Sequence, residues 1–567
     1  MFNDHFNPDE PFETATELTT FARDYLREQI RSADIGMTGA NFVLADSGTI
    51  TLVTNEGNAR KTAVTPHTHI AVAGVEKVIP SADVLRPFVE LIAKAATGQP
   101  IPQYVTMLTP PVESPTIDFS RPTEPLGSGD DDRAFHLVLV DNGRMAMRND
   151  EQLDETLYCI RCGVCANFCA NFQHVSGHAF GGETYTGGIA TGWEAGVHGQ
   201  DAAATFNDFC TGCSRCADAC PVKIDIPWIN TVVRDRINHD TDADTFDFFV
   251  EGLTPDEEPG TLDVQKRLFG NFRTVARLGS ATAPLSNRVS DLGPVRAAME
   301  QLFGVDARRD LPTFQRETLI DWFAARESPE NDGRTVVLYP DTYTNYVLVN
   351  RGKATVRVLE ALGAQVELAT PQESGRAPLS QGIIQTATRR ASDVAADLTP
   401  YIEDGHDVVV IEPSDLAAFR REYEKLLDEE TYERVAENSY DVMEYVYGLL
   451  HHGADTDALA DPSEPLAYHS HCQQRTLGVE SYTEAVLTEL GFDVITSNVE
   501  CCGMAGSFGY KSEYYELSMD VGSDLEEQFA DESDRTLVAS GTSCTEQMTD
   551  LFARDVVHPI ELIAPTR

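Results

Sequence analysis

The segment Cys159-Ile160-Arg161-Cys162-Gly163-Val164-Cys165-Ala166-Asn167-Phe168-Cys169 has a cysteine spacing that decides how this chain is organised. The same spacing returns in Cys210-Thr211-Gly212-Cys213-Ser214-Arg215-Cys216-Ala217-Asp218-Ala219-Cys220-Pro221. In each run, two residues separate the first three cysteines, and three residues precede the fourth. Eight of the twelve cysteines of the 567-residue chain therefore lie within residues 159–220. Clustering of this kind indicates metal binding rather than disulfide bonding.

Both runs fit the pattern that bacterial ferredoxins use for two 4Fe–4S clusters. The short spacers let a tight loop place three thiolates on one cluster, and the fourth cysteine of each run reaches the other cluster. We therefore predict two crossed ligand sets: Cys159, Cys162, Cys165 and Cys220 for the first cluster, and Cys210, Cys213, Cys216 and Cys169 for the second. Structural zinc is the disfavoured alternative, because zinc ribbons use cysteine pairs rather than two matching quartets.

The composition is strongly acidic. Asp and Glu contribute 91 residues against 43 Lys and Arg, which gives a formal net charge of −48. The acidic residues are spread along the chain, so their mutual repulsion lowers stability when salt is dilute. Because concentrated salt shortens the screening length to about 3 Å, the composition indicates the solvated surface of a halophilic protein. The sequence has no basic stripe, which argues against nucleic-acid binding.

No stretch approaches the roughly 18 consecutive apolar residues of a membrane span. The first residues, Met1-Phe2-Asn3-Asp4-His5-Phe6, do not form a basic segment followed by an apolar one, so no signal peptide is evident. We expect a cytoplasmic protein. A peripheral position at the inner face of the membrane, through a partner, stays open.

Hydrophobic periodicity predicts a multidomain α+β and α/β chain. Leu18, Phe21, Tyr25 and Leu26 fall at helical spacing, and short strands are expected at residues 41–45, 50–54, 69–73 and 136–140. We predict four regions: an α/β domain over residues 15–150, a helical two-cluster ferredoxin domain over 151–235, a helical connector over 236–333, and a duplicated α/β domain over 334–567.

The duplication rests on an internal repeat. Residues 359–368 read LEALGAQVEL, and residues 487–496 read LTELGFDVIT. Each copy predicts a strand, a helix, a glycine turn and a strand, which together form a pseudo-symmetric α/β domain.

The N-terminal third resembles the LUD domain of the lactate-utilization protein B family. The resemblance rests on residues 38–42 (TGANF), 54–60 (TNEGNAR), 69–77 (HIAVAGVEK) and 136–144 (HLVLVDNGR), and it continues into Cys159–Gly163 and Gly177–Gly181. It covers roughly residues 17–325 and starts more than about a hundred residues into that family's domain. It therefore implies the second half of a LUD domain. The other half is expected on another polypeptide, or the domain is reduced to a docking surface.

The C-terminal third resembles the cysteine-rich CCG domain, through residues 468–475 (YHSHCQQR), 501–509 (CCGMAGSFG) and 540–544 (SGTSC). The resemblance implies one iron–sulfur site on Cys472, Cys501, Cys502 and Cys544. The internal repeat places Tyr343, Glu373, Ser374 and Asp415 at the equivalent positions, so the first copy has no thiolates. A zinc site and a redox-active Cys501–Cys502 pair are the alternatives. His469 and His471 are possible extra ligands, although a structural role is favoured for both.

The two resemblances together imply an iron–sulfur electron-transfer subunit of a system that oxidises a 2-hydroxy acid, with L-lactate as the first choice. Residues 181–188 lack the strand-to-helix setting of a dinucleotide site, so we predict no catalytic residue on this chain. A partner flavoprotein dehydrogenase or LUD-domain subunit would supply electrons, and a quinone or other membrane carrier would receive them. One alternative is the iron–sulfur subunit of a glycerol-3-phosphate or glycolate dehydrogenase. A second alternative is a non-enzymatic redox scaffold or sensor.

Overall fold

The computed structural model describes residues 2–8, 10–54, 57–100, 102, 104–109, 114–115, 123, 132–240, 262–327, 329, 333–370, 372–462 and 464–565. The chain divides into two compact units: residues 1–164 with 220–224, and residues 165–219 with 225–567. Both units combine sheets with helices. The predicted multidomain α+β and α/β fold class is therefore confirmed.

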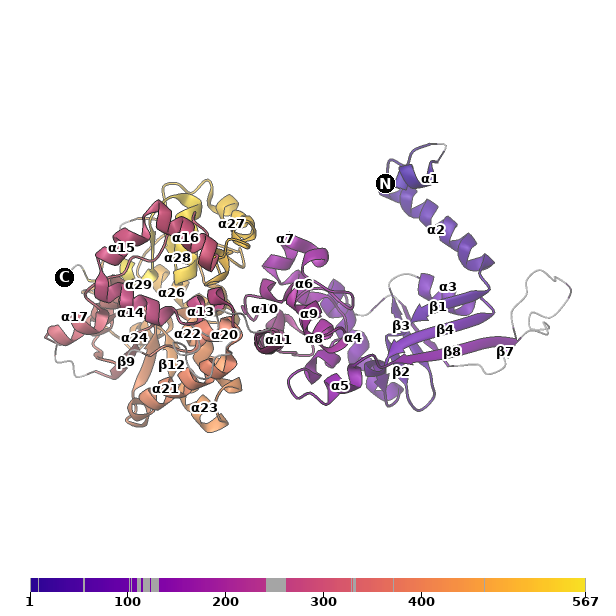
Figure 1. The fold of residues 1–567 in the computed structure, drawn as a ribbon, viewed down its shortest axis with the longest axis horizontal. Coiled ribbons are helices and arrows are strands. Elements are labelled where there is room, and N and C mark those ends of the chain that lie inside the picture. The colour runs from indigo at the N-terminus through magenta and orange to yellow at the C-terminus, as the bar shows by residue number, and fades with distance from the viewer. Residues whose placement is uncertain are drawn as a thin grey trace. The chain divides into compact units, whose positions relative to one another are not determined.

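Two four-stranded sheets form the centre of the first unit (Figure 1). One sheet has the order β1–β4–β8–β7, from β1 (Ile35–Gly39), β4 (Thr68–Gly74), β8 (Asp132–Val140) and β7 (Ser114–Pro115), with only β7 antiparallel. The other has the order β5–β2–β3–β6, from β5 (Val78–Ile79), β2 (Phe42–Leu44), β3 (Ile50–Thr54) and β6 (Tyr104–Leu108). Val43 and Ile50 of the second sheet share a core cluster with Ala71 and Ala73 of the first.

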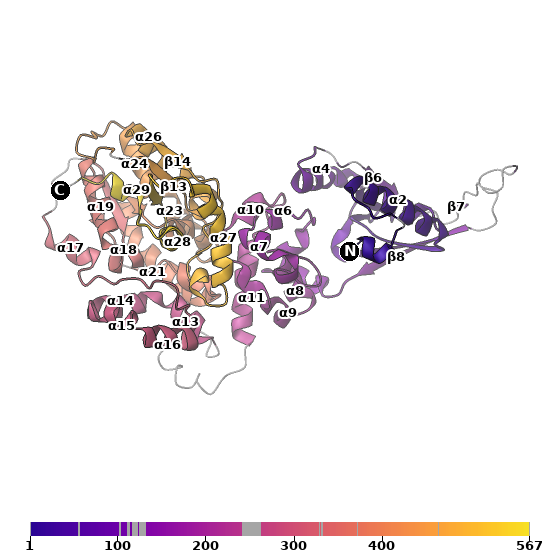
Figure 2. The same cartoon turned by 90° about the horizontal axis from the view of Figure 1, so that it is seen from above.

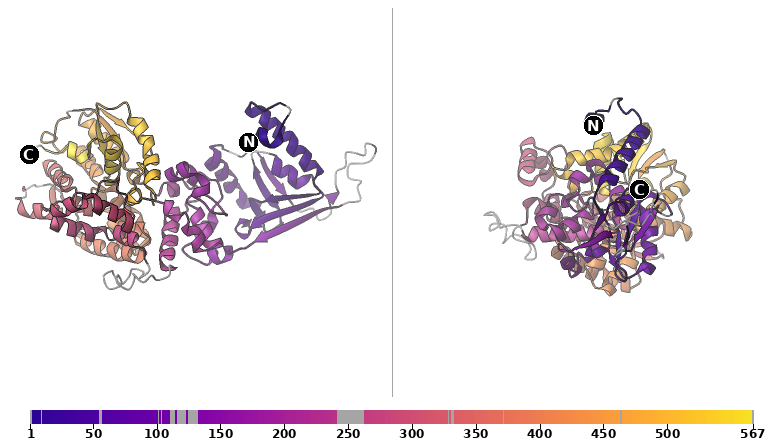
Figure 3. Two further views of the ribbon diagram at one scale, coloured as in Figure 1. Left: turned by 45° about the horizontal axis from the view of Figure 1, so that its top comes forward. Right: turned by 90° about the vertical axis from the view of Figure 1, so that its right-hand side faces the viewer.

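The helices of the first unit differ in how far they are buried. The helix α4 (Leu85–Thr97) packs Phe88 and Ile92 against the core at β2 and β5. The predicted helix around Leu18 is α2 (Ala15–Ser32), which begins at a Thr14 capping box and has no buried residue. Figure 3 shows α2 standing away from the sheets. The shorter helices are α1 (Phe2–Phe6), α3 (Asn58–Val64) and α5 (Arg144–Arg148).

Several helices lie within, between and after the two cysteine runs along the chain. They are α6 (Val164–Asn167), α7 (Ala170–Ala179), α8 (Ala190–Val197), α9 (Gln200–Ala204), α10 (Arg215–Ala219) and α11 (Ile226–Asp240). Asn230 of α11 connects this region, because its side-chain amide donates to Gly188 O at 2.8 Å and its Oδ1 accepts from Thr191 at 2.7 Å.

Further helices follow α11, and residues 241–261 lie outside the described part of the chain. The helices are α13 (Val264–Gly270), α14 (Phe272–Thr282), α15 (Leu285–Ser290), α16 (Gly293–Phe303) and α17 (Leu319–Ala325). Figure 2 shows α13 to α16 lying together along one side of the C-terminal repeats.

The C-terminal part contains two copies of one α/β architecture. The first copy has the sheet order β10–β9–β11–β12, and the second has β14–β13–β15–β16, both entirely parallel. The first strands are β9 (Thr335–Tyr339), β10 (Gln365–Leu368), β11 (Asp407–Val410) and β12 (Ser439–Asp441). The second are β13 (Leu466–His469), β14 (Val494–Thr496), β15 (Thr536–Ala539) and β16 (Val556–Val557).

The helices of the two copies cover both faces of their sheets, as buried parallel strands require. The first copy has α18 (Thr342–Tyr346), α19 (Val349–Ala361), α20 (Arg376–Ser380), α21 (Ile384–Glu403), α22 (Pro413–Arg420), α23 (Glu429–Glu437) and α24 (Val442–His451). The second has α25 (Cys472–Leu477), α26 (Glu480–Glu489), α27 (Tyr515–Phe529), α28 (Thr542–Phe552) and α29 (Pro559–Leu562). One core cluster includes Leu338 and Val409 of the first copy and Tyr468 and Val538 of the second, so the copies share a single interior.

Candidate metal centres and an adjoining cavity

The two cysteine runs adopt the same unusual backbone conformation. The third and fifth residues of each run have positive φ: +57° at Arg161, +78° at Gly163, +67° at Gly212 and +64° at Ser214. A left-handed conformation costs a residue other than glycine about 1–2 kcal/mol. Arg161 and Ser214 therefore hold a conformation that their residue types disfavour, as is frequent at ligand sites. The two runs therefore share a backbone conformation as well as a cysteine spacing.

The four residues predicted to hold the second cluster, Cys210, Cys213, Cys216 and Cys169, all lie in the second unit. Burial raises the pKa of the Cys216 thiol well above its ordinary value, and Cys213, Cys210 and Cys169 raise it further. Burial also raises the pKa of Cys169 to about 12, with further contributions from Cys213 and Cys210. Thiols that raise one another's pKa are close neighbours, so the structure brings this set together.

The residues predicted to hold the first cluster are divided between the units. Cys159, Cys162 and Cys220 belong to the first unit, and Cys165 belongs to the second. Burial raises the pKa of Cys159, with a smaller contribution from Cys162, and it raises the pKa of Cys162, with a contribution from Cys220. The structure therefore gathers three members of this set within one unit.

A charge cluster, in which Arg144 is buried and Arg161 is exposed, connects the N-terminal sheets to the first cysteine run. The Lys77 ammonium donates to Cys159 O at 3.0 Å. The Glu76 carboxylate pairs with Arg144 at 2.9 Å and with Arg161 at 3.8 Å. All four side chains line a cavity of about 260 Å³. In the sequence these residues stand within longer motifs, and their cluster was not predicted. The available signal was the charged pair Glu76-Lys77 directly after an apolar strand.

The four C-terminal cysteines meet in the second copy of the repeat. Cys472 opens α25, Cys544 lies in α28, and Cys501 and Cys502 lie in the loop after β14. The Cys544 thiol donates to the Cys502 sulfur, which lowers the pKa of Cys502 and raises that of Cys544. Burial raises the pKa of Cys472 and of Cys501, and in both cases Cys502 contributes. All four cysteines are free thiols.

The two candidate histidines have different surroundings. The His471 Nδ1 accepts from the Gln473 N–H at 3.2 Å and so caps α25. His469 is completely buried, and burial lowers its pKa to about 3. Capping accounts for His471 without a metal, in line with the structural role that the sequence analysis favoured.

The second cysteine run contacts both copies of the repeat. The Gly212 carbonyl accepts from Arg376 of the first copy and from Gln473 of the second, each at 3.1 Å. The neighbouring Cys213 lines the same cavity as Cys472, and it contributes to the raised pKa of Cys472. The predicted ligand set of the second cluster, which includes Cys213, therefore borders the four C-terminal cysteines.

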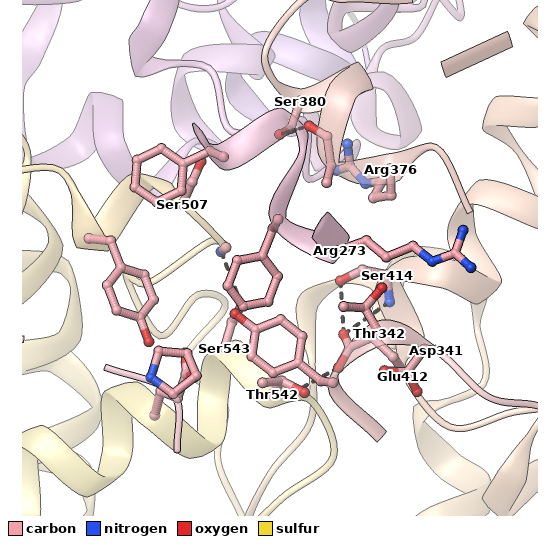
Figure 4. Close-up of a pocket in the computed structure, with 18 of the residues that line it drawn as sticks. Arg273, Asp341, Thr342, Arg376, Ser380, Glu412, Ser414, Ser507, Thr542 and Ser543 are labelled. Atoms are coloured by element: carbon pink, nitrogen blue, oxygen red, sulfur yellow. Dashed lines mark hydrogen bonds between the residues drawn. The ribbon is translucent and has the colours of Figure 1, made fainter. Parts of the chain in front are cut away.

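That cavity has a volume of about 620 Å³, and residues from both copies line it. Cys472, Cys501 and Cys502 line it from the second copy, and the equivalent residues Tyr343, Glu373 and Ser374, together with Asp415, line it from the first. In Figure 4, Asp341, Thr342, Glu412 and Ser414 lie together on one side of the cavity, across from Ser507. The repeat in the sequence aligns the two copies, but it does not predict that they line one cavity.

The donor chemistry fits an iron–sulfur group. The three cysteine sets offer buried and half-buried thiols, which as thiolates select iron–sulfur or zinc over hard cations. A bound metal would displace the thiol protons that burial now favours. Within the described ranges, no three His, Cys, Asp or Glu side chains come close enough to hold one metal ion.

Three family models match the chain: the LUD domain at residues 3–126, the 4Fe-4S dicluster domain at residues 155–224 and the cysteine-rich domain at residues 466–549. The chain carries all three domains. The dicluster model identifies an iron–sulfur domain in this chain, and the chain is also similar to relatives named for lactate utilization.

Those relatives are called lactate utilization protein B. The protein of Shouchella clausii is 42% identical over 212 residues, which are 37% of this chain and 42% of the relative. The Bacillus pumilus protein is 34% identical over 322 residues, or 56% of this chain and 62% of the relative. The Bacillus subtilis protein is 33% identical over 322 residues, or 56% of this chain and 61% of the relative. This chain thus spans between 42% and 62% of their length.

Among the residues that the structure describes, no helix combines the length and the apolar character that crossing a bilayer requires.

Proposed function

We propose that this chain is the electron-transfer subunit of a system that oxidises a 2-hydroxy acid, with L-lactate as the first substrate to test. A partner flavoprotein or LUD-domain subunit would oxidise the substrate. Electrons would pass along this chain toward a quinone. The relatives named for lactate utilization support the substrate class, and the iron–sulfur domains support the role.

One observation carries this proposal: Cys213 of the dicluster domain and Cys472 of the cysteine-rich domain line a single cavity. Gly212, beside Cys213, hydrogen-bonds to Gln473, beside Cys472. Two sets of candidate metal-binding thiols that border one cavity favour electron transfer between them over two independent structural sites.

We assign two 4Fe–4S clusters to the crossed ligand sets Cys159, Cys162, Cys165 and Cys220, and Cys210, Cys213, Cys216 and Cys169. A third centre, iron–sulfur or zinc, is assigned to Cys472, Cys501, Cys502 and Cys544. When bound, iron–sulfur groups take up and release single electrons. The chain's own contribution is to bury the thiols and to hold the loops, through contacts such as the 2.7 Å pair between Arg215 and Glu500.

The test is to purify the chain with its partners anaerobically in high salt and to add one substrate at a time. We expect L-lactate to reduce the clusters, measured by electron paramagnetic resonance. If glycerol 3-phosphate or glycolate reduces them while lactate does not, the substrate assignment fails and the alternative dehydrogenase is favoured. If dithionite produces no 4Fe–4S signal, the chain is no electron carrier at all.

The third centre has a matched pair of variants in the two copies. Cys472→Ala should lower the metal content per chain while both dicluster signals persist. Tyr343→Phe alters the equivalent residue of the first copy, so it should leave the metal content unchanged. Equal metal content in Cys472→Ala and wild type would contradict a centre on these four cysteines.

A further inference from the structure

We propose that the 620 Å³ cavity binds a lipid quinone, with the cysteine-bearing copy on one side of the quinone ring and a proton-donating wall from the cysteine-free copy on the other. This inference rests on the proposed function, in which the quinone is the electron acceptor, and it adds the site and the proton source. The first copy, although it lacks cysteines, then contributes one wall of the binding site.

The part of the cavity away from the cysteines is apolar. It is lined by side chains of the connector helices and the segment that follows them: Leu268, Phe269, Phe272, Leu278, Met299, Leu311 and Phe314. Phe272 stacks on Tyr343 with ring centroids 5.1 Å apart and an interplanar angle of 23°. Flat aromatic surfaces suit a planar ring, and the apolar lining suits a hydrocarbon tail.

Leu278 of α14 lines the cavity and is 60% exposed, so we infer that the entrance lies at α14. Seven large apolar side chains are exposed among the described residues of this unit, and five of them lie between residues 278 and 302: Leu278, Leu285, Val289, Leu292 and Leu302. Residues 271–303 also contain four arginines against two acidic residues, in a chain of net charge −48. An apolar, locally basic entrance suits an acceptor delivered from an anionic membrane surface.

The opposite wall is acidic. Asp341, Glu373, Glu412 and Asp415 line the cavity from the first copy, and Ser374 donates a hydrogen bond to Asp415. The groups that act most strongly on Asp415 or are acted on by it are Asp341, Glu412, Glu373, Tyr339 and Tyr423, while the cations of this wall pair elsewhere, Arg390 with Glu373 and His471 with Glu412. Burial holds the pKa of Asp415 well above its ordinary value. Burial and the neighbouring acids therefore favour the protonated form of Asp415.

The same wall argues against an anionic substrate in this cavity. A 2-hydroxy acid would bring its carboxylate against four acidic side chains. The two arginines that line the cavity already have partners, since Arg376 faces Glu422 at 3.3 Å and Arg273 donates to Gln372 at 3.3 Å. A neutral acceptor avoids this repulsion.

The step balances for a quinone. Two electrons from the reduced iron–sulfur groups and two protons convert the two carbonyl oxygens into hydroxyls, with two O–H bonds formed. Asp415 gives up one of those protons, its own O–H bond breaks, and the carboxylate regains a proton from water. The second proton comes from water or from another acid of the wall.

The first test measures binding without turnover. The full-length protein is photolabelled with an azidoquinone that carries a ten-carbon tail, and the labelled peptides are mapped by mass spectrometry. We expect labelling within residues 268–314 and a loss of at least about half of it in Leu278→Trp, which narrows the entrance. Leu285→Trp is the matched control, because Leu285 is 65% exposed and does not line the cavity. Labelling elsewhere, or an equal loss in both variants, overturns the site.

The second test separates proton transfer from electron transfer. Dithionite-reduced protein is mixed with decylubiquinone or with ferricenium, which takes one electron and no proton. Asp415→Asn should slow quinone-driven cluster oxidation at least about tenfold and leave ferricenium-driven oxidation unchanged. The exposed Asp404→Asn should change neither rate. Equal slowing with both oxidants would make Asp415 structural and overturn the proton-donating wall.

The two proposals fail in different ways. If wild-type clusters reduce and ferricenium reoxidises them while the quinone does not, the electron-carrier role stands and the quinone site falls. If dithionite does not reduce any cluster, both proposals fall.

Discussion

At the scale of single residues, buried carboxyl groups recur at helix starts in the repeats. Asp441 caps α24 by accepting from the Met443 N–H at 2.8 Å, and its other oxygen accepts from Gln474 at 2.9 Å. Asp441 is 1% exposed, and burial raises the pKa of its carboxyl group to about 6 despite these hydrogen bonds. The folded protein therefore binds the Asp441 proton more tightly than the unfolded chain does.

This difference predicts a pH-dependent stability. With a raised folded-state pKa, the protonated form is favoured on folding. The contribution of Asp441 to stability is therefore largest below the pKa of the unfolded chain, and it falls as the pH rises toward about 6. Asp441→Asn cannot titrate, so its free energy of unfolding relative to wild type should rise by about 1 kcal/mol between pH 5 and pH 7. Denaturant unfolding at several pH values measures this.

Asp428 provides the control, because it caps α23 in the same way but is exposed, and hydrogen bonds from Thr431 lower its pKa. The free energy of unfolding of Asp428→Asn relative to wild type should not rise between pH 5 and pH 7. A flat difference for Asp441→Asn would mean that Asp441 is not protonated at pH 5 in the folded protein.

At the scale of elements, the two copies turn at equivalent glycines. Gly375 and Gly503 have φ of +85° and +93°, and a Cβ at either position would lie within 2.7 Å of a helix carbonyl oxygen, that of Ala387 or of Ser518. The turn before α20 and the turn after Cys502 therefore keep one backbone geometry, although the first copy has lost its cysteines. The geometry persists because each turn packs against a helix of its own copy.

Gly375→Ala and Gly405→Ala separate backbone conformation from close approach. Both glycines have nearly the same φ, +85° and +84°, but a Cβ at Gly405 meets nothing within 4 Å. Gly405→Ala should cost about 1 kcal/mol for the left-handed conformation, and Gly375→Ala should cost about 2 kcal/mol more for overpacking. Thermal unfolding of the full chain measures both. Equal costs would mean that α21 can move away from the turn.

At the scale of the whole molecule, charge dominates. A net charge of −48 on 567 residues destabilises the compact state by self-repulsion when screening is weak. Raising KCl from about 0.1 M to 1 M shortens the screening length from about 10 Å to 3 Å. The midpoint of thermal unfolding should therefore rise by several degrees over that range. NaCl at equal ionic strength should give the same curve, since screening depends on ionic strength. A midpoint insensitive to salt would contradict this account.

The sequence by itself predicted the local elements and proposed the candidate thiol ligands. The spacing of Cys159–Cys169 and Cys210–Cys220, the strand at Ile50–Thr54 and the repeat around Gly363 and Gly491 are local patterns, and short-range geometry fixes what they can form. The same holds for the choice of thiol ligands, because it follows from residue type. The crossed ligand sets remain predictions.

Only the tertiary structure decided what lies beside those thiols. Cys213 and Cys472 line one cavity, and Asp341 and Asp415 line the same cavity from the first copy. The cavity forms because the two copies share one core and enclose a space between them. The charge cluster of Glu76 and Arg144 depends likewise on a strand end meeting a distant turn. Contacts of this kind depend on the burial of apolar surface between distant segments. The spacing of residues in the sequence does not show which polar groups this burial brings together.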